Sequence, residues 1–124
     1  NLGRIDMNDT HLAIGCYPGG SSFKVLELSM LSSPSYQTVP GKDCPSEVSF
    51  NDKGFFIPDN DNIIGWNSVA DALAGSSPTM SFGGRTDKSN MGTKMAAGIG
   101  WDGYHFWVGE YKFSNRLLGF APSK

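Results

Sequence analysis

The sequence predicts an all-β domain, an antiparallel sandwich or jelly-roll-like barrel with one short helix. Short apolar runs alternate in hydrophobicity every second residue, and turn-forming residues separate these runs at close spacing. The 16 glycines and 7 prolines among 124 residues exceed the usage of a helical protein. The length suits one domain spanning residues 1–124. We expect about seven to nine short strands.

The first half of the chain predicts a series of strands. Residues 2–7 and 11–16 favour two strands joined by a polar turn, and residues 23–31 favour a third strand. The range 32–46 contains three prolines and is predicted to be a long irregular loop. Residues 48–57 then favour a hairpin around a polar, glycine-containing turn.

One segment, residues 69–74, has the features of a helix. Asn67 or Ser68 can cap its first turn by accepting a backbone hydrogen bond. Gly75 stands where a helix is commonly terminated by a residue with positive φ. A helix of about two turns is marginal alone, so we expect it to pack against the core.

The C-terminal third predicts a three-stranded antiparallel meander. The pair Asp102-Gly103 separates the apolar runs 93–101 and 104–113, and residues 117–120 form the last strand. An Asp-Gly pair between strands favours a two-residue type I′ turn, which requires positive φ at both positions.

The composition of this meander suggests how its side chains pack. The run 104–113 is apolar on both faces near its middle, so we expect a central strand covered on both sides, with Phe106 and Trp107 in the core. The small residues of 96–100 leave room that Trp107 or Tyr111 could fill by cross-strand aromatic–glycine pairing.

Charge and hydropathy exclude several classes of function. Only 18% of residues are charged, the net charge is −2 and the sequence pI is near 5.5, so we expect no nucleic-acid partner. No run of 18 apolar residues occurs, so we expect no membrane insertion. Aromatic residues are too frequent, and charge too low, for intrinsic disorder.

Two cysteines, Cys16 and Cys44, leave two interpretations open. They form a disulfide, or they are two buried free thiols that behave as small apolar residues. Neither lies in a C-x-x-C motif, which argues against zinc binding and redox catalysis. The chain begins at Asn1, so we expect a processed or excised part of a longer protein. Low charge and Gly- and Ser-rich loops favour an extracellular or virion-surface location.

The polar segment 58–62 is the one candidate for metal binding. Its carboxylates, Asp59 and Asp61, are oxygen ligands of the kind that calcium prefers. It is not an EF-hand, because no glycine stands at the sixth position and no glutamate at the twelfth. A looser calcium site in this loop is one interpretation, and an Asx-rich turn that caps its own backbone is the other. We otherwise expect no cofactor.

Aromatic side chains interleaved with polar ones suggest a ligand-binding surface. Trp101, Asp102 and Tyr104 place two rings and a carboxylate at a predicted hairpin tip. Such rings can stack on the C–H faces of sugars while polar side chains bind the hydroxyls. The further candidate ligand-binding residues are Arg85, Asn60 and Tyr36.

These features favour a non-catalytic recognition module. We expect a lectin-like receptor- or glycan-binding head of a viral, phage or bacterial surface structure, assembled as a dimer or trimer. An alternative is a structural domain, such as a protruding capsid or fibre-tip element, that associates with itself through residues 91–100. A third is a small secreted hydrolase that uses His11 or His105, although no G-x-S-x-G elbow is present. No motif is specific enough to indicate a family.

Overall fold

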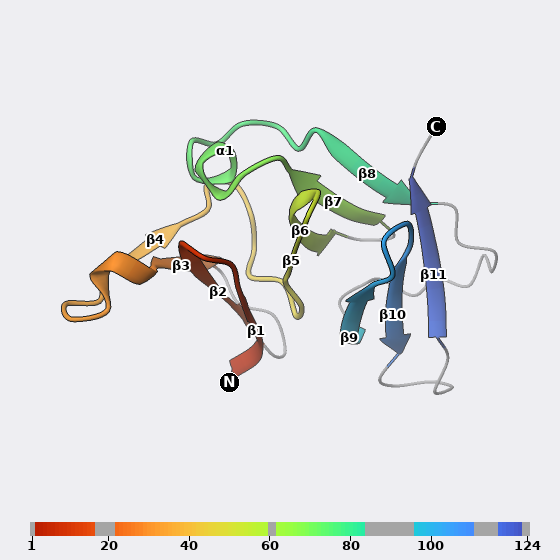
Figure 1. Cartoon of the computed structure of the whole chain (residues 1–124), viewed down its shortest axis with the longest axis horizontal. Helices are drawn as coiled ribbons and strands as arrows, with labels where there is room; N and C mark the ends of the chain where they lie inside the picture. Colours follow the sequence, from red (N-terminus) through yellow and green to blue (C-terminus); the bar gives the residue numbers. More distant parts are fainter. Residues whose placement is uncertain (1, 17–21, 60–61, 84–95, 111–116, 123–124) are drawn as a thin grey trace.

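The computed structural model confirms the all-β architecture with one short α-helix. It describes residues 2–16, 22–59, 62–83, 96–110 and 117–122 (Figure 1). Every strand pair is antiparallel, and the strands form a four-stranded sheet and a seven-stranded sheet that is nearly barrel-shaped. The described residues contain eleven strands, more than expected, because two segments without a clear alternating pattern also pair.

Each sheet is built mainly from strands that follow one another in the chain. The first has the order β1-β2-β3-β4, with β1 (Leu2–Met7), β2 (His11–Cys16), β3 (Lys24–Glu27) and β4 (Tyr36–Thr38). The second has the order β5-β6-β7-β8-β11-β10-β9, with β5 (Ser49–Asn51), β6 (Gly54–Asp59), β7 (Asn62–Trp66), β8 (Met80–Gly83), β9 (Ala96–Trp101), β10 (Phe106–Glu110) and β11 (Leu117–Pro122). A 3-10 helix, η1 (Leu28–Met30), follows β3, and α1 (Val69–Leu73) follows β7.

Two predicted segment boundaries are wrong. The single strand predicted over residues 23–31 ends at Glu27, because the chain turns into η1, closed by the Leu31 N–H donating to the Leu28 carbonyl at 3.3 Å. The loop predicted over residues 32–46 contains β4, which pairs with β3.

The helix α1 begins as predicted and ends one residue earlier. Ser68 is its N-cap, and its Oγ accepts a hydrogen bond from the Asp71 N–H at 3.1 Å. Gly75 adopts a φ of 77°, the left-handed conformation expected after the helix. Val69 and Ala72 are buried, so packing against the core supports this short helix.

Strand β6 separates two hydrophobic cores. Phe55 and Phe56 point to opposite faces of the sheet, as consecutive strand residues must. Phe55 stacks on Phe23 and Trp66, with ring centroids 5.6 and 6.0 Å apart, in a core between the two sheets. Phe56 packs 4.8 Å from Phe106 in a second core on the other face, enclosed by the curved sheet.

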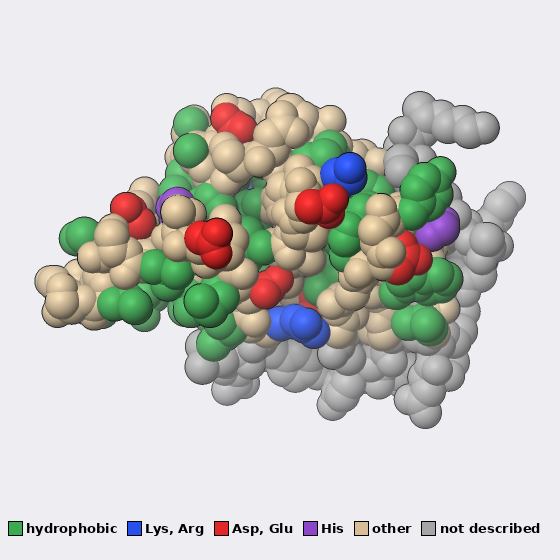
Figure 2. Space-filling view, viewed as in Figure 1, with side chains coloured by type: hydrophobic (Ala, Val, Ile, Leu, Met, Phe, Trp, Pro, Cys, Tyr) green, Lys and Arg blue, Asp and Glu red, His purple; other side chains and the backbone are tan. Residues whose placement is uncertain are grey.

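The large hydrophobic side chains that remain exposed form two groups in the described part of the chain. One lies on the four-stranded sheet and η1, and comprises Ile5, Met7, Met30, Leu31 and Tyr36. The other lies on the β9–β10–β11 meander, and comprises Tyr104, Trp107 and Leu117. Figure 2 shows hydrophobic side chains at both ends of the molecule, over these same elements.

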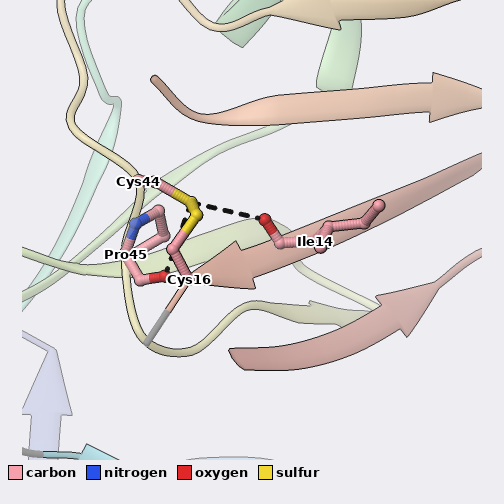
Figure 3. Close-up of a disulfide and its surroundings, with 4 residues drawn as sticks. All are labelled: Ile14, Cys16, Cys44 and Pro45. Carbon is pink, nitrogen blue, oxygen red and sulfur yellow. Dashed lines mark hydrogen bonds between the residues drawn. A yellow bond between two sulfur atoms is a disulfide. The ribbon is translucent and has the colours of Figure 1, made fainter. Parts of the chain in front are cut away.

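The structure joins Cys16 to Cys44, which is the first of the two interpretations left open by the sequence. The Cα atoms lie 5.6 Å apart, and Cys44 is buried (Figure 3). The Cys44 Sγ lies 3.6 Å from the Ile14 carbonyl oxygen and 3.9 Å from that of Pro45. The bond therefore attaches the end of β2 to the segment that leads into β5.

Backbone hydrogen bonds hold the same segment against the first sheet. The Cys16 N–H donates to the Pro45 carbonyl at 2.7 Å, and the Arg4 N–H donates to the Ser46 carbonyl at 3.3 Å. A Cβ on Gly15 would lie 2.8 Å from the Ser46 carbonyl oxygen, so only glycine permits this approach. The connection between the two sheets is therefore close-packed.

The meander is present as predicted, but its turn is different. Trp101 pairs with Phe106, so four residues connect the strands instead of two. The Asp102 N–H donates to the His105 carbonyl at 3.2 Å. Within this turn, Gly103 has a positive φ of 101°. The longer turn forms because the Asp102 carboxylate binds two backbone N–H groups within it.

Strand β10 lies between β9 and β11 but is covered on one face only. Phe106 is fully buried, whereas Trp107 is 38% exposed, so the prediction that Trp107 belongs to the core is wrong. Its ring does pack on a glycine, but that glycine is Gly119 of β11: a Cβ there would lie 3.0 Å from Trp107 Cζ3. Tyr111, the other ring considered, lies outside the described residues.

The disulfide should contribute strongly to stability. Its cysteines are 28 residues apart, and removing a cross-link of this span costs about 3–4 kcal/mol in the chain-entropy model. We expect the double variant Cys16→Ala/Cys44→Ala to lose about that much free energy of unfolding, measured by urea denaturation. Wild-type protein in reductant should behave like the variant; a loss below about 1 kcal/mol in both would contradict the role assigned to the bond.

Candidate functional site

The best candidate site is the tip of the β9–β10 hairpin. We call it the hairpin-tip site and define it by Asp102, Tyr104, His105 and Trp107, with Trp101 at its base. These residues lie at the right-hand end of the molecule as drawn, over β9 and β10 (Figures 1 and 2). Hydrophobic, acidic and histidine side chains gather there on one surface.

Asp102 organises the site through its carboxylate. Oδ1 accepts hydrogen bonds from the backbone N–H groups of His105 and Tyr104 at 2.6 and 2.8 Å. Oδ2 accepts one from the indole Nε1–H of Trp107 at 2.8 Å and lies 3.3 Å from the His105 Nδ1. The hydrogen bond from the His105 backbone, followed by that from Trp107, lowers the pKa of Asp102 well below its usual range.

The carboxylate thus contacts the rings of Trp107 and His105 directly, but contacts Tyr104 only through its backbone. Both oxygens of Asp102 accept hydrogen bonds from its own hairpin, and a direct contact between Asp102 and a ligand stays a prediction. The centroid of the His105 ring lies 4.6 Å from that of Tyr104 and 5.8 Å from that of Trp107. Tyr104 is 62% exposed, which leaves much of its ring open to solvent.

Trp101 has a different role from the exposed rings. It is partly buried, and its ring packs 4.6 Å from Phe106 and 5.6 Å from Phe82. Its indole Nε1–H donates to Asp52 Oδ1 at 3.1 Å, which connects β9 to the β5–β6 turn. Lys53 lies beside this contact, with its Nζ 3.9 Å from Asp52 Oδ2. Trp101 therefore supports the site from beneath.

Of the three remaining predicted ligand-binding residues, the structure describes Tyr36, which does not join the hairpin-tip site. Tyr36 is 52% exposed but lies on β4, at the opposite end of the molecule (Figure 1). The Lys24 Nζ lies 5.9 Å from its ring centroid. Arg85 and Asn60 lie outside the described residues.

Part of the candidate metal-binding segment 58–62 belongs to a strand. Asp59 belongs to β6 and pairs with Asn62, and its Oδ2 lies 2.9 Å from the Lys42 Nζ. Asp61 lies outside the described residues. Within the described ranges, no three His, Cys, Asp or Glu side chains are grouped as metal ligands. Calcium binding at Asp59 and Asp61 stays a prediction.

The two histidines make local contacts within turns. The His11 Nδ1 lies 2.8 Å from Thr10 Oγ1, and that hydroxyl also donates to Asn8 Oδ1 at 3.1 Å. His105 contacts Asp102 in the hairpin tip, as described above. Both cysteines are in the disulfide, so neither has a free thiol to act as a nucleophile.

A buried carboxyl group, Glu47, was not predicted from the sequence. It is 5% exposed, and its Oε2 accepts no hydrogen bond, although the Arg4 Nε lies 3.8 Å away. Burial raises the pKa of Glu47 to about 7, against the opposing effect of the Arg4 charge. Polar residues alternate with apolar Val48 and Phe50 here, a pattern that places the polar face towards solvent by default. The structure instead buries Glu47 and Ser49 on that face.

Comparison with known proteins gives no further information about function. No family model matches the chain, and neither the curated proteins nor the solved structures contain a significant match. In the part of the chain that the structure describes, no helix has the length and hydropathy needed to cross a bilayer.

Glu47 should make stability depend on pH. Its folded-state pKa of about 7 lies above the ordinary value of 4.5, so its contribution to stability is complete below pH 4.5 and is lost as pH rises through 7. Relative to wild type, Glu47→Gln should gain roughly 2–3 kcal/mol of unfolding free energy between pH 5 and pH 8. Urea denaturation of both proteins at each pH measures the difference between their free energies of unfolding. The effects of other titrating groups are common to both proteins and cancel in this difference. A difference that does not change with pH would refute the prediction.

Proposed function

We propose that this domain is a non-catalytic recognition module that binds a glycan, or a glycan-bearing surface receptor, at the hairpin-tip site. The observation that carries the proposal is the pair of exposed rings, Tyr104 and Trp107, on a turn in which Asp102 binds the Tyr104 backbone N–H and the Trp107 indole N–H. Exposed aromatic rings at fixed positions are typical of binding surfaces, because they offer large contact areas with few rotatable bonds.

The hydrogen bonds of Asp102 support this function by ordering the turn backbone and the Trp107 ring before a ligand arrives. A free tryptophan side chain loses rotamer freedom on binding, but Trp107 is already restrained by its indole hydrogen bond and by Gly119 beneath it. Restraint in the free protein lowers the entropic cost of association. A sugar ring could then stack on an aromatic face while its hydroxyls contact nearby polar groups.

The disulfide supports a location outside the reducing cytosol. Disulfides persist mainly in secreted proteins, the periplasm and cell or virion surfaces. A recognition head on a viral, phage or bacterial surface structure fits both this chemistry and the exposed aromatic tip.

Removing either exposed ring should weaken glycan binding. We expect Tyr104→Ala and Trp107→Ala each to raise the Kd by about tenfold or more, as truncation of a central aromatic contact does. A glycan array identifies the sugar, and calorimetry on that sugar measures the variants. Leu117→Ala is the matched control, because Leu117 is 66% exposed on the same meander and is not part of the site. Blank arrays, or equal loss in the control, would contradict the proposal.

A paired glycine substitution tests whether the position of Trp107 matters. Gly119→Ala places a methyl group about 3.0 Å from Trp107 Cζ3, so the ring must move, whereas Gly100→Ala meets no atom within 4 Å. We expect Gly119→Ala to weaken binding several-fold and to shift the Trp107 indole N–H resonance in NMR spectra. Gly100→Ala should leave both unchanged. The same affinity in both variants would show that the ring does not act from a fixed position.

A further inference from the structure

The turn between β1 and β2 contains a tripeptide that the proposed function does not use. Asn8, Asp9 and Thr10 form an N-x-[ST] sequence, the acceptor for N-linked glycosylation in secreted proteins, with no proline at the middle position. No other asparagine among the 124 residues is followed by a serine or threonine two positions later. A pattern this short also arises by chance, so its surroundings decide whether it is suited to modification.

The residues of this tripeptide lie on the surface, outside both strands. Asn8, Asp9 and Thr10 are all exposed, in a hairpin turn that is closed by the Asn8 N–H donating to the His11 carbonyl at 3.0 Å. The turn that joins β1 to β2 lies in the left half of Figure 1, whereas β9 and β10 lie in the right half. A glycan on this turn would therefore project from a different part of the molecule than the hairpin-tip site.

Hydrogen bonds determine which end of the Asn8 amide is engaged within the turn. Oδ1 accepts bonds from the backbone N–H groups of Thr10 and His11 at 2.9 and 2.8 Å, and from the Thr10 hydroxyl at 3.1 Å. Because a backbone N–H can only donate, the oxygen of the amide must lie on this side. In the part of the chain that the structure describes, Asn8 Nδ2 has no hydrogen-bond partner. The atom that would bond to a glycan is thus the unengaged end of the amide.

A second turn of the same chain provides a comparison. Asn51 also precedes an aspartate, and its Oδ1 accepts the Lys53 N–H at 2.8 Å, so it forms a similar local turn. Lys53 stands where Thr10 stands in the first turn, so the third-position hydroxyl is missing. The Asn51 Nδ2 is also buried. Asn8 therefore differs from Asn51 in two properties that glycosylation requires, the third-position hydroxyl and an accessible side chain.

The disulfide is a second feature typical of the route on which this modification occurs. The bond between Cys16 and Cys44 requires an oxidising environment, and the lumen of the endoplasmic reticulum provides one. Asparagines in N-x-[ST] sequences of secreted proteins are the acceptors of N-linked glycans. The cross-link and the exposed tripeptide are separate observations, and both fit a chain that passes through a eukaryotic secretory pathway.

We propose that Asn8 carries an N-linked oligosaccharide. In the transfer, Asn8 Nδ2 bonds to the anomeric carbon of an oligosaccharide that is attached to a lipid pyrophosphate. The bond from that carbon to the pyrophosphate oxygen breaks, the lipid pyrophosphate leaves with the bonding electrons, and the amide loses one proton. No group is oxidised or reduced. This modification is separate from the glycan binding proposed above, because here the chain carries the sugar covalently.

The turn can present Asn8 to an enzyme at a low cost in free energy. The hydrogen bonds that Asn8 makes all lie within residues 8–11, and its side-chain bonds are exposed to solvent. Short exposed turns of this kind open locally without unfolding the strands beside them. The β1–β2 register, from Met7 paired with Leu12 onwards, does not depend on these bonds.

Peptide mass spectrometry of the protein secreted from cultured eukaryotic cells, with a cleavable leader to direct secretion, tests the proposal. The wild-type peptide that contains Asn8 should carry an added mass. Peptide N-glycosidase, which cleaves the glycan from the amide nitrogen, should remove that mass and leave a carboxylate at position 8. The peptide that contains Asn51 should be unmodified in the same sample.

Three variants define the acceptor. Asn8→Gln and Thr10→Ala should lose the added mass completely, whereas Thr10→Ser keeps a hydroxyl and should retain it. The mass is measured on chains from both cells and medium, so a variant that folds poorly still gives a result. A wild-type chain without added mass at Asn8 overturns the proposal, as does added mass on this peptide that persists in Asn8→Gln or Thr10→Ala. Blank glycan arrays would not change these results, because the two sites share no residue.

Discussion

The two sheets depend on the segment of residues 44–50, which lies between them. The disulfide at Cys44 and the backbone bonds of residues 45 and 46 attach this segment to the first sheet, and β5 then starts the second. Its alternating side chains face different surroundings: Val48 packs in the core between the sheets, whereas Glu47 is buried on the opposite side beside Arg4. The disulfide therefore attaches a buried segment that also contains a desolvated carboxyl group.

The two exposed apolar regions lie at opposite ends of the molecule and have different chemistry. At the hairpin tip, rings are mixed with a charged carboxylate and a histidine, which suits contact with a polar ligand. On the four-stranded sheet and η1, the exposed hydrophobic side chains are mostly aliphatic.

Local patterns in the sequence predicted most elements, whereas side-chain environments were less predictable. The alternation in residues 11–16 and the cap at Ser68 are local signals, and both elements form where expected. The predicted two-residue hairpin turn was wrong because an Asp-Gly pair is compatible with more than one turn. The longer turn is stabilised by the hydrogen bonds that the Asp102 carboxylate accepts from backbone N–H groups. Composition also does not separate Trp66, which is 1% exposed, from Trp107 at 38%. That difference in exposure depends on which strands become neighbours, and the residues that make those contacts are far apart in the sequence. At the candidate hairpin-tip site, Trp101, Asp102 and Tyr104 are neighbours in the sequence, but the hydrogen bonds of the Asp102 carboxylate were not predicted.

The alternation of Phe55 and Phe56 on β6 has a consequence for how the protein unfolds. Each ring belongs to a different core, yet the two share one peptide bond and one short strand. When β6 leaves the sheet, both cores lose an aromatic residue at the same moment. An unfolding intermediate that keeps one core intact without β6 is therefore not expected. The domain should accordingly unfold as one cooperative unit despite its two sheets. Backbone amide protons in both cores should then show similar protection factors against hydrogen exchange. Two cores divided by a single strand thus give a small domain the cooperativity of a single core.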